Sequence, residues 1–134
     1  MAHKLPIRIY YEDTDAGGVI YYGNYLKFVE RGRTEWLREL GINQSQLREE
    51  TGLFFVVRHC EADYLAPGHL DDELVVETHL QQLGNASISM VQNVIRPRDD
   101  TLLAIVKVTV VCINEKLKAA RIPQHIRELI EKES

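Results

Sequence analysis

The chain has 134 residues, of which 45% are hydrophobic and 27% are charged, a balance typical of a folded domain in water. This length predicts one domain over residues 1–134, because such a chain holds one hydrophobic core and divides poorly into two. The net charge of −4 argues against a general nucleic-acid binder, which needs a basic surface to neutralise phosphates. The N-terminal residues lack the apolar segment of a secretion signal, and no apolar run is long enough to cross a bilayer, so a cytoplasmic protein is expected.

Two cysteines, Cys60 and Cys112, lie in apolar segments with the character of strands. Two thiols do not make a disulfide framework, so both side chains are expected to be buried and reduced. The histidines show no metal-ligand spacing with these cysteines, and no glycine-rich nucleotide loop follows a strand. The sequence therefore predicts neither a metal site nor a bound cofactor.

The first predicted element is a strand over residues 5–11, which leads into an acidic, glycine-rich segment at residues 11–25. Every second residue of the strand is apolar or aromatic, which predicts one buried face. The positions on this face are Leu5, Ile7, Ile9 and Tyr11.

A long amphipathic helix is predicted next, because apolar residues recur at intervals of three and four over residues 25–40. Gly23 and Asn24 form a plausible start, and Gly41 is expected at the C′ position that ends the helix. Gly32 lies within the apolar stripe, where an alanine would favour the helix by roughly 1 kcal/mol. Another surface is therefore expected to pack against Gly32 closely enough to exclude a Cβ atom.

The second half of the chain follows the alternating pattern of β-strands, after a short helix predicted over residues 43–50 with Asn43 as N-cap. The Gly84-Asn85 pair predicts a hairpin turn. The last strand is apolar at consecutive positions, which indicates either burial on both faces or pairing at an oligomer interface. The predicted strands cover residues 54–64 (with a bulge or bend), 72–83, 86–96 and 102–113, and a final helix covers 123–132.

These elements predict an α+β fold. About five strands joined by hairpin-like turns make an antiparallel sheet, and the one long helix must bury its apolar stripe on a face of that sheet. The short helices are expected at the periphery.

The acidic segment places Glu12, Asp13 and Asp15 directly before a helix N-terminus, where backbone N–H groups are unpaired and the helix dipole is positive. A carboxylate beside such donors is either reactive or a structural cap. For Asp15, the competing interpretation is an Asx-turn or N-cap. Asp13 fits a turn or cap better than a chemical role.

Residues 11–25 read Tyr-Glu-Asp-Thr-Asp-Ala-Gly-Gly-Val-Ile-Tyr-Tyr-Gly-Asn-Tyr, and with the following helix they resemble the signature of hotdog-fold acyl-CoA thioesterases. Within that family the segment is most similar to the YbgC type, which is associated with the Tol-Pal cell-envelope system. It also shares the active-site pattern of 4-hydroxybenzoyl-CoA thioesterase. Similarity at residues 55–58, 64–72 and 110–113 extends the resemblance over nearly the whole chain.

The resemblance implies a long helix wrapped by a curved five-stranded antiparallel sheet. It also implies dimers, often paired into tetramers, with active sites at subunit interfaces. Asp15, the second aspartate of the Asp-Thr-Asp triplet, would be the catalytic carboxylate. Tyr22 departs from the family, which commonly has a histidine at that position, but a backbone N–H there would survive the exchange.

Thioester hydrolysis needs a nucleophile or base on one side of the carbonyl and hydrogen-bond donors where negative charge develops on oxygen. We expect backbone amides near Tyr22 and Gly23 to polarise the carbonyl, while Asp15 either attacks it or activates a water. The Tyr22 side chain is expected to pack, to line the acyl pocket or to hydrogen-bond the substrate carbonyl. The basic candidates for contacts with CoA phosphates are Arg58, Arg96 and Arg98.

Two other functions compete with an acyl-CoA thioesterase that releases free acid and CoA. A hotdog dehydratase or isomerase generally needs a histidine as acid-base partner, and residues 11–25 contain none. A non-catalytic module that binds acyl-CoA or acyl-carrier protein would leave Asp15 without a purpose. Acyl-carrier protein is also a candidate carrier of the substrate for the enzyme.

Overall fold

The computed structural model describes residues 2–132. Met1 and residues 133–134, which complete the predicted domain, lie outside the described residues. The elements in chain order are β1 (His3–Arg8), a 3-10 turn η1 (Tyr11–Asp13), α1 (Asn24–Glu39), α2 (Gln44–Thr51), β2 (Phe54–Tyr64), β3 (Glu73–Leu83), β4 (Ser87–Arg96), β5 (Thr101–Ile113) and α3 (Gln124–Lys132).

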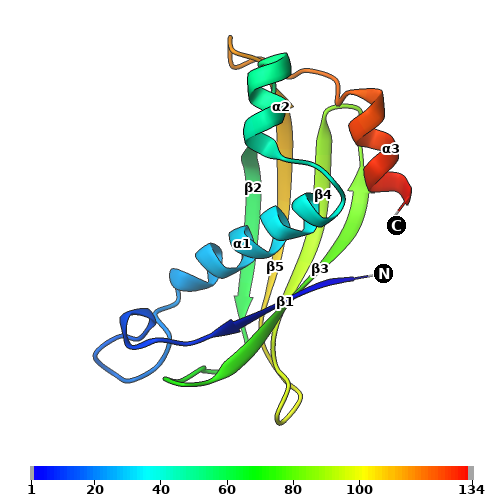
Figure 1. Ribbon diagram of the computed structural model, residues 1–134. Coiled ribbons are helices and arrows are strands. Elements are labelled where there is room, and N and C mark those ends of the chain that lie inside the picture. Colours follow the sequence, from blue (N-terminus) through cyan, green and yellow to red (C-terminus); the bar gives the residue numbers. More distant parts are fainter. Residues whose placement is uncertain (1, 133–134) are drawn as a thin grey trace.

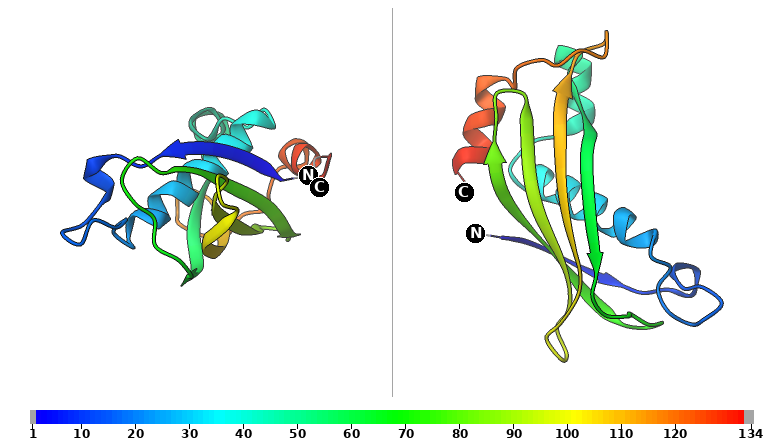
Figure 2. Two further views of the ribbon diagram at one scale, coloured as in Figure 1. Left: turned by 90° about the horizontal axis from the view of Figure 1, so that it is seen from below. Right: turned by 180° about the vertical axis from the view of Figure 1, so that it is seen from behind.

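The strands form one antiparallel sheet in the order β1-β3-β4-β5-β2, so β1 and β2 are its edges. Figure 1 shows α1 lying across one face of the curved sheet, and the right-hand view of Figure 2 shows the sheet in front with α1 behind it. The short helices α2 and α3 lie together near one end of the sheet. This arrangement confirms the α+β class and the long helix wrapped by a five-stranded antiparallel sheet.

The close approach predicted at Gly32 is confirmed. A Cβ atom added at Gly32 would lie 2.6 Å from Cγ1 of Val76, a fully buried residue of β3. The next strand reaches the same part of the helix, because Gln92 Nε2 in β4 donates to the Val29 carbonyl at 2.7 Å. The α1 backbone therefore packs directly on the centre of the sheet, with a buried polar contact that fixes its position.

The helix ends follow the sequence closely. Gly23 is the N-cap of α1, and Gly41 follows the helix with φ of 93°, a conformation that glycine adopts at no steric cost. The Asn43 side chain accepts a hydrogen bond from the Gln46 N–H at 3.0 Å, which confirms the predicted cap of α2.

The strands predicted after residue 53 are also confirmed, including the irregularity in β2, where the pairing with β5 shifts between Val57 and His59. Gly84-Asn85 connects β3 to β4 in an antiparallel hairpin. β5 lies between β4 and β2, and the consecutive residues 110–113 are all buried. Of the two alternatives for this apolar strand, burial on both faces therefore holds for its C-terminal part.

Two expectations are wrong. The first strand ends at Arg8, and Tyr11 is 79% exposed in η1, because the Asp13 side chain accepts a hydrogen bond from the Tyr10 N–H and turns the chain out of the sheet. Cys60 is exposed, because it lies in β2 at the edge of the sheet, whereas Cys112 is buried as expected. Both cysteines are free thiols.

Candidate functional site

The acidic loop is a small closed hairpin between β1 and α1. Thr14 and Ile20 form an antiparallel bridge at its base, and the Asp15 N–H donates to the Val19 carbonyl at 2.8 Å. Gly18 makes the reversal with φ of 80°, and its N–H donates to the Asp15 carbonyl at 3.0 Å. The Asp15 backbone is therefore fixed by two hydrogen bonds, while the residue itself is exposed.

The Asp15 carboxylate is oriented by its own loop. Its Oδ1 accepts a hydrogen bond from the Gly17 N–H at 2.9 Å, which is the Asx-turn geometry predicted as the structural alternative. Its second oxygen has no hydrogen-bond partner within residues 2–132. The Asx-turn and a chemical role are thus compatible, because one oxygen fixes the side chain and the other faces the surroundings.

Asp13 joins the loop to the start of α1, in agreement with its predicted structural role. Its Oδ2 accepts from the Tyr10 N–H at 2.8 Å. Its carbonyl oxygen accepts from the Tyr21 N–H at 3.0 Å and from Nδ2 of the nearly buried Asn24 at 2.9 Å. These bonds hold the acidic loop against the helix N-terminus.

Two backbone donors directly before α1 are unused. The N–H groups of residues 24–26 donate to the carbonyl oxygens three positions earlier, over 2.9 to 3.3 Å. The N–H groups of Tyr22 and Gly23 have no acceptor among the described residues. Unpaired amides at a helix N-terminus favour negative charge, and Tyr22 and Gly23 are the residues that directly precede α1.

The Tyr22 side chain belongs to a cluster of tyrosine rings. The Tyr22 ring is 61% exposed and lies 4.9 Å from the Tyr21 ring centroid and 5.8 Å, edge to face, from that of Tyr64. The Tyr64 ring centroid also lies 5.5 Å from that of the buried Tyr25, and burial raises the pKa of the Tyr64 phenol above its ordinary value. Sequence reasoning did not single out Tyr64, because only the fold brings the end of β2 beside the start of α1.

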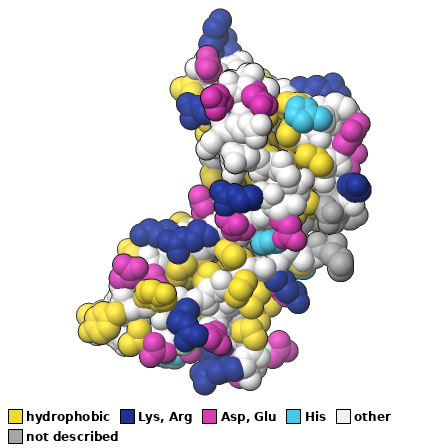
Figure 3. Space-filling view, viewed as in Figure 1, with side chains coloured by type: hydrophobic (Ala, Val, Ile, Leu, Met, Phe, Trp, Pro, Cys, Tyr) yellow, Lys and Arg dark blue, Asp and Glu magenta, His cyan; other side chains and the backbone are white. Residues whose placement is uncertain are grey.

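Hydrophobic side chains gather on the part of the surface formed by the acidic loop and the start of α1 (Figure 3). The exposed residues there are Tyr10, Tyr11, Tyr21, Tyr22 and Leu26. An apolar surface of this kind beside polar donors is typical of a binding site or an interface.

The three candidate arginines differ in their surroundings. Arg58 is exposed on the edge strand β2, beside the irregularity, and Arg98 is 71% exposed, with its guanidinium 3.8 Å from Asp72 Oδ1. Arg96 is only 8% exposed, and its guanidinium binds the carboxylates of Asp72 and Asp99. Arg96 is therefore occupied within the protein and is not available for CoA phosphates.

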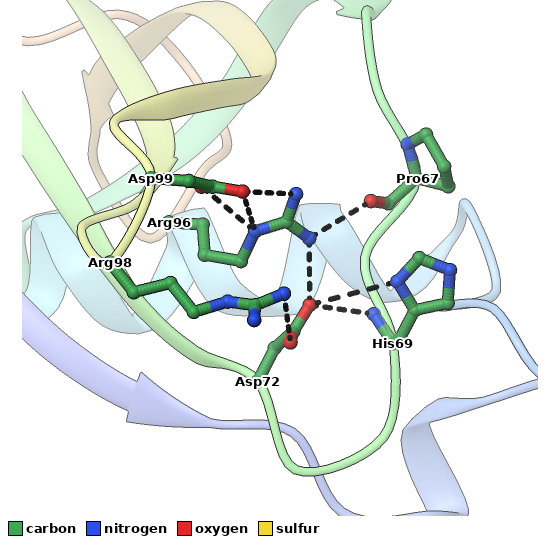
Figure 4. Close-up of polar contacts among 6 residues, drawn as sticks. All are labelled: Pro67, His69, Asp72, Arg96, Arg98 and Asp99. Carbon is green, nitrogen blue, oxygen red and sulfur yellow. Dashed lines mark hydrogen bonds and ion pairs between the residues drawn. The ribbon is translucent and has the colours of Figure 1, made fainter.

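Figure 4 shows this charged cluster, which lies where the loop before β3 meets the turn after β4. Burial alone would raise the pKa of Asp72, but the His69 N–H and Arg96 hydrogen bonds lower it. The hydrogen bond from Arg96 lowers the pKa of Asp99 to about 2, and Asp99 in turn raises the pKa of Arg96. All three groups are therefore charged at neutral pH.

Sequence reasoning missed the pairing of Asp72 with Arg96. The signal was present in the β3–β4 hairpin, because its register pairs Val75 with Ile95 and so brings the residues just outside that pair together.

None of the helices within residues 2–132 is long and apolar enough to span a membrane. The same residues contain no group of three or more His, Cys, Asp or Glu side chains placed to hold a metal ion.

Comparison with known proteins identifies the family. Residues 10–130 match the family model of the thioesterase-like superfamily. The chain is 42% identical to the acyl-CoA thioesterase YbgC of Haemophilus influenzae, over 92% of this chain and 90% of the relative. It is 41% identical to the acyl-CoA thioester hydrolase YbgC of Escherichia coli, over 92% of this chain and 91% of the relative.

A solved structure agrees with this match. A probable thioesterase from Bartonella henselae is 38% identical, superposes with a TM-score of 0.85, and aligns over 92% of this chain and all of that one. The family expected from the motif is thereby confirmed: the chain belongs to the thioesterase-like superfamily, with the YbgC acyl-CoA thioesterases among its relatives.

Proposed function

We propose that this protein is an acyl-CoA thioesterase that hydrolyses the thioester bond to a free acid and CoA. The observation that carries the proposal is that one segment between β1 and α1 holds the Asp15 carboxylate, with one oxygen unbound, and at its end the unpaired N–H groups of Tyr22 and Gly23. A thioester carbonyl between them would meet a nucleophile or base on one side and oxyanion donors on the other. The match to YbgC thioesterases supports this assignment.

Two routes fit the geometry. In the first, an Asp15 oxygen attacks the carbonyl carbon, the C–S bond breaks, CoA leaves as thiolate and takes up a proton, and water hydrolyses the resulting mixed anhydride. In the second, Asp15 takes a proton from a water that attacks the carbonyl directly. In both routes the amides of Tyr22 and Gly23 stabilise the negative oxygen of the tetrahedral intermediate, because they are already in place before charge develops.

The proposal is tested by release of free thiol from acyl-CoAs of graded chain length and from benzoyl-type CoAs. We expect turnover of at least one class, and loss of it in Asp15→Ala. Tight binding of acyl-CoA with no CoA release from any of them would instead identify the non-catalytic binding module.

We also propose that Arg58 binds CoA phosphates, because its guanidinium is exposed and has no partner among the described residues. Arg58→Ala should raise KM for acyl-CoA and leave KM for the corresponding acyl-pantetheine unchanged, because the latter lacks the nucleotide. Arg121→Ala, at an exposed arginine before α3, is the matched control. Equal effects of Arg58→Ala on both substrates would remove the assignment.

The oligomer is proposed to be a homodimer through β2, with dimers pairing into a tetramer. β2 is an edge strand of 11 residues with Val56 and Val57 exposed. A long open strand edge that carries exposed apolar side chains favours pairing with a second copy. Light scattering should show an oligomer, and Val57→Glu should shift it toward monomer, while Leu117→Glu on an exposed turn should not. A monomeric wild-type protein would exclude the assembly.

The described strands form one sheet, which supports a single domain over residues 1–134 and predicts one cooperative unfolding transition. We propose a cytoplasmic enzyme without a cofactor, linked to the Tol-Pal system, that takes acyl-CoA and also acyl-carrier protein as substrate carriers. These points are tested in turn by cell fractionation, by activity after exhaustive dialysis against chelator, which should be full, and by envelope phenotypes of a deletion strain. The carrier is tested by hydrolysis of acyl groups bound to acyl-carrier protein.

A further inference from the structure

The segment between β2 and β3, residues 65–72, is held in shape by one buried ion pair (Figure 4). Arg96 Nη1 donates to Asp72 Oδ2 at 2.9 Å and to the Pro67 carbonyl at 3.4 Å. The same Oδ2 accepts from the His69 N–H at 2.9 Å. Arg96 and Asp72 are 8% and 9% exposed, so this pair is shielded from solvent and joins both ends of the segment.

This segment holds the entrance to the acidic loop. Ile9, the last residue before the chain turns out of the sheet, donates its N–H to the Asp72 carbonyl at 2.9 Å. In return the Ile9 carbonyl accepts from the Asp71 N–H at 3.0 Å. The Ile9 side chain is 1% exposed, so the entrance is fixed by both packing and hydrogen bonds.

The same segment also holds the exit from the loop. The Ile20 N–H donates to the Gly68 carbonyl at 2.9 Å, and Val19 forms a bridge with His69. Ile20 packs so closely on Gly68 that a Cβ atom there would collide with the Ile20 side chain and lie 2.8 Å from Leu103 Cδ2. The entrance and the exit of the acidic loop are therefore both bound to residues 68–72.

Between these two anchors the loop has no buried residue, since every position from 10 to 19 is exposed or half-buried. The placement of Asp15 relative to the sheet thus depends on the internal hydrogen bonds of the loop, on the bond from Asn24 Nδ2 to the Asp13 carbonyl, and on the two anchored ends. We propose that Arg96 is a positioning residue for Asp15, acting through the Asp72 ion pair and residues 67–72. This inference rests on the proposed function, because it assumes that the position of Asp15 limits turnover.

The guanidinium fork is essential to this role. Arg96 Nε donates to both Asp99 oxygens at 3.1 and 3.2 Å, while Nη1 reaches Asp72 and Pro67 on the other side. A lysine carries the same charge at a single point and cannot bind both carboxylates and the carbonyl at once. Arg96→Lys therefore keeps the charge and removes the geometry.

The test compares Arg96→Lys with Arg127→Lys, which alters another largely buried arginine that binds a backbone carbonyl, that of Gly84, at 2.8 Å. We expect Arg96→Lys to lower kcat about 10-fold to 100-fold with KM within about threefold, because small displacements of reacting groups have effects of this size. Amide hydrogen exchange at Ile20 and Asp15 should accelerate in this variant alone. Arg127→Lys should change none of these quantities.

Arg96→Lys combined with a second substitution distinguishes positioning of Asp15 from a general loss of structure. In Asp15→Asn protein, Arg96→Lys should cause no further loss of kcat, because the group that it positions is already removed. If Arg96→Lys fails to fold, Asp99→Ala, which removes the lateral partner of the guanidinium and leaves Asp72 in place, should show the same pattern with a smaller loss.

Unchanged kcat with unchanged exchange at Ile20, or a loss that persists in full without the Asp15 carboxylate, would overturn the inference. An active Asp15→Asn enzyme would instead overturn the catalytic assignment of Asp15. Amide exchange at Ile20 would then show by itself whether Arg96 holds residues 67–72 and the end of the acidic loop in place.

Discussion

Asp15 Oδ1 and the Gly17 N–H lie 2.9 Å apart, so the loop that carries the carboxylate also aims it. The bond requires only an oxygen acceptor, which an asparagine also provides. A substitution to asparagine therefore separates the charge of Asp15 from the shape of its loop.

Asp15→Asn should lower kcat by about 10²-fold to 10⁴-fold, because it removes a base or nucleophile while preserving the bond to Gly17. Free-thiol release measures the loss, and an unchanged melting temperature shows that the loop is intact. Glu12→Gln, at an exposed carboxylate three positions earlier, is the control and should keep wild-type turnover. Single-turnover hydrolysis in ¹⁸O-water distinguishes the two routes, since label in the Asp15 carboxylate indicates direct attack.

The Tyr22 backbone should matter more than its side chain. Replacing the amide N–H of residue 22 by an ester oxygen removes one oxyanion donor and should cost about 3 kcal/mol of transition-state stabilisation, roughly 100-fold in kcat. Tyr22→Phe, which keeps the N–H and the ring, should stay within about threefold of wild type. The opposite order of effects would assign the polarising role to the phenol.

Gly32→Ala should destabilise the fold by about 1–3 kcal/mol, although helix propensity alone would favour alanine. The added Cβ would lie 2.6 Å from Val76 Cγ1, so the helix or the sheet must move. Urea denaturation measures the change. Val76→Ala in the same chain removes the obstructing methyl group, and the double variant should lose less stability than the two single effects added together.

The Asp72 ion pair should contribute to acid stability. The folded pKa of Asp72 is lowered below its unfolded value of about 3.9, so its contribution is present above about pH 4 and is lost as the pH falls through the lower folded pKa. Asp72→Asn should be less stable than wild type by about 2 kcal/mol at pH 7. The difference should shrink steadily below about pH 4; a constant difference down to pH 2 would show that the carboxylate charge is not its source.

The elements of the fold were predictable because each one carries its own periodicity. The stripe of α1, the alternation of β3 and β4 and the glycine pairs at turns are local signals. The exposure of Cys60 was not predictable in this way, because it depends on β2 being at the edge of the sheet. The prediction that Tyr11 lies on the buried face of a strand failed for a local reason. The Asp13 side chain accepts the hydrogen bond of the Tyr10 N–H in place of a neighbouring strand.

The residues of the candidate site also differ in whether a local sequence signal could locate them. Asp15 and the donors at Tyr22 and Gly23 lie within one continuous stretch, so the motif located them together. The Tyr64 ring comes from β2 and the Arg96 guanidinium from β4, and only the fold brings Tyr64 beside Tyr22 and Arg96 beside Asp72.

The contact at Gly32 has a consequence for changes in chain length. Gly32 lies about two and a half turns along α1 from Gly23, roughly 13 Å by the rise of an α-helix. Since a Cβ atom at this position would lie 2.6 Å from Val76 Cγ1, sliding the helix by one residue would place a larger side chain against the sheet. Inserting or deleting one residue between positions 23 and 32 would rotate the two unpaired N–H groups by about 100° around that axis. This stretch of helix should therefore tolerate substitutions far better than insertions or deletions.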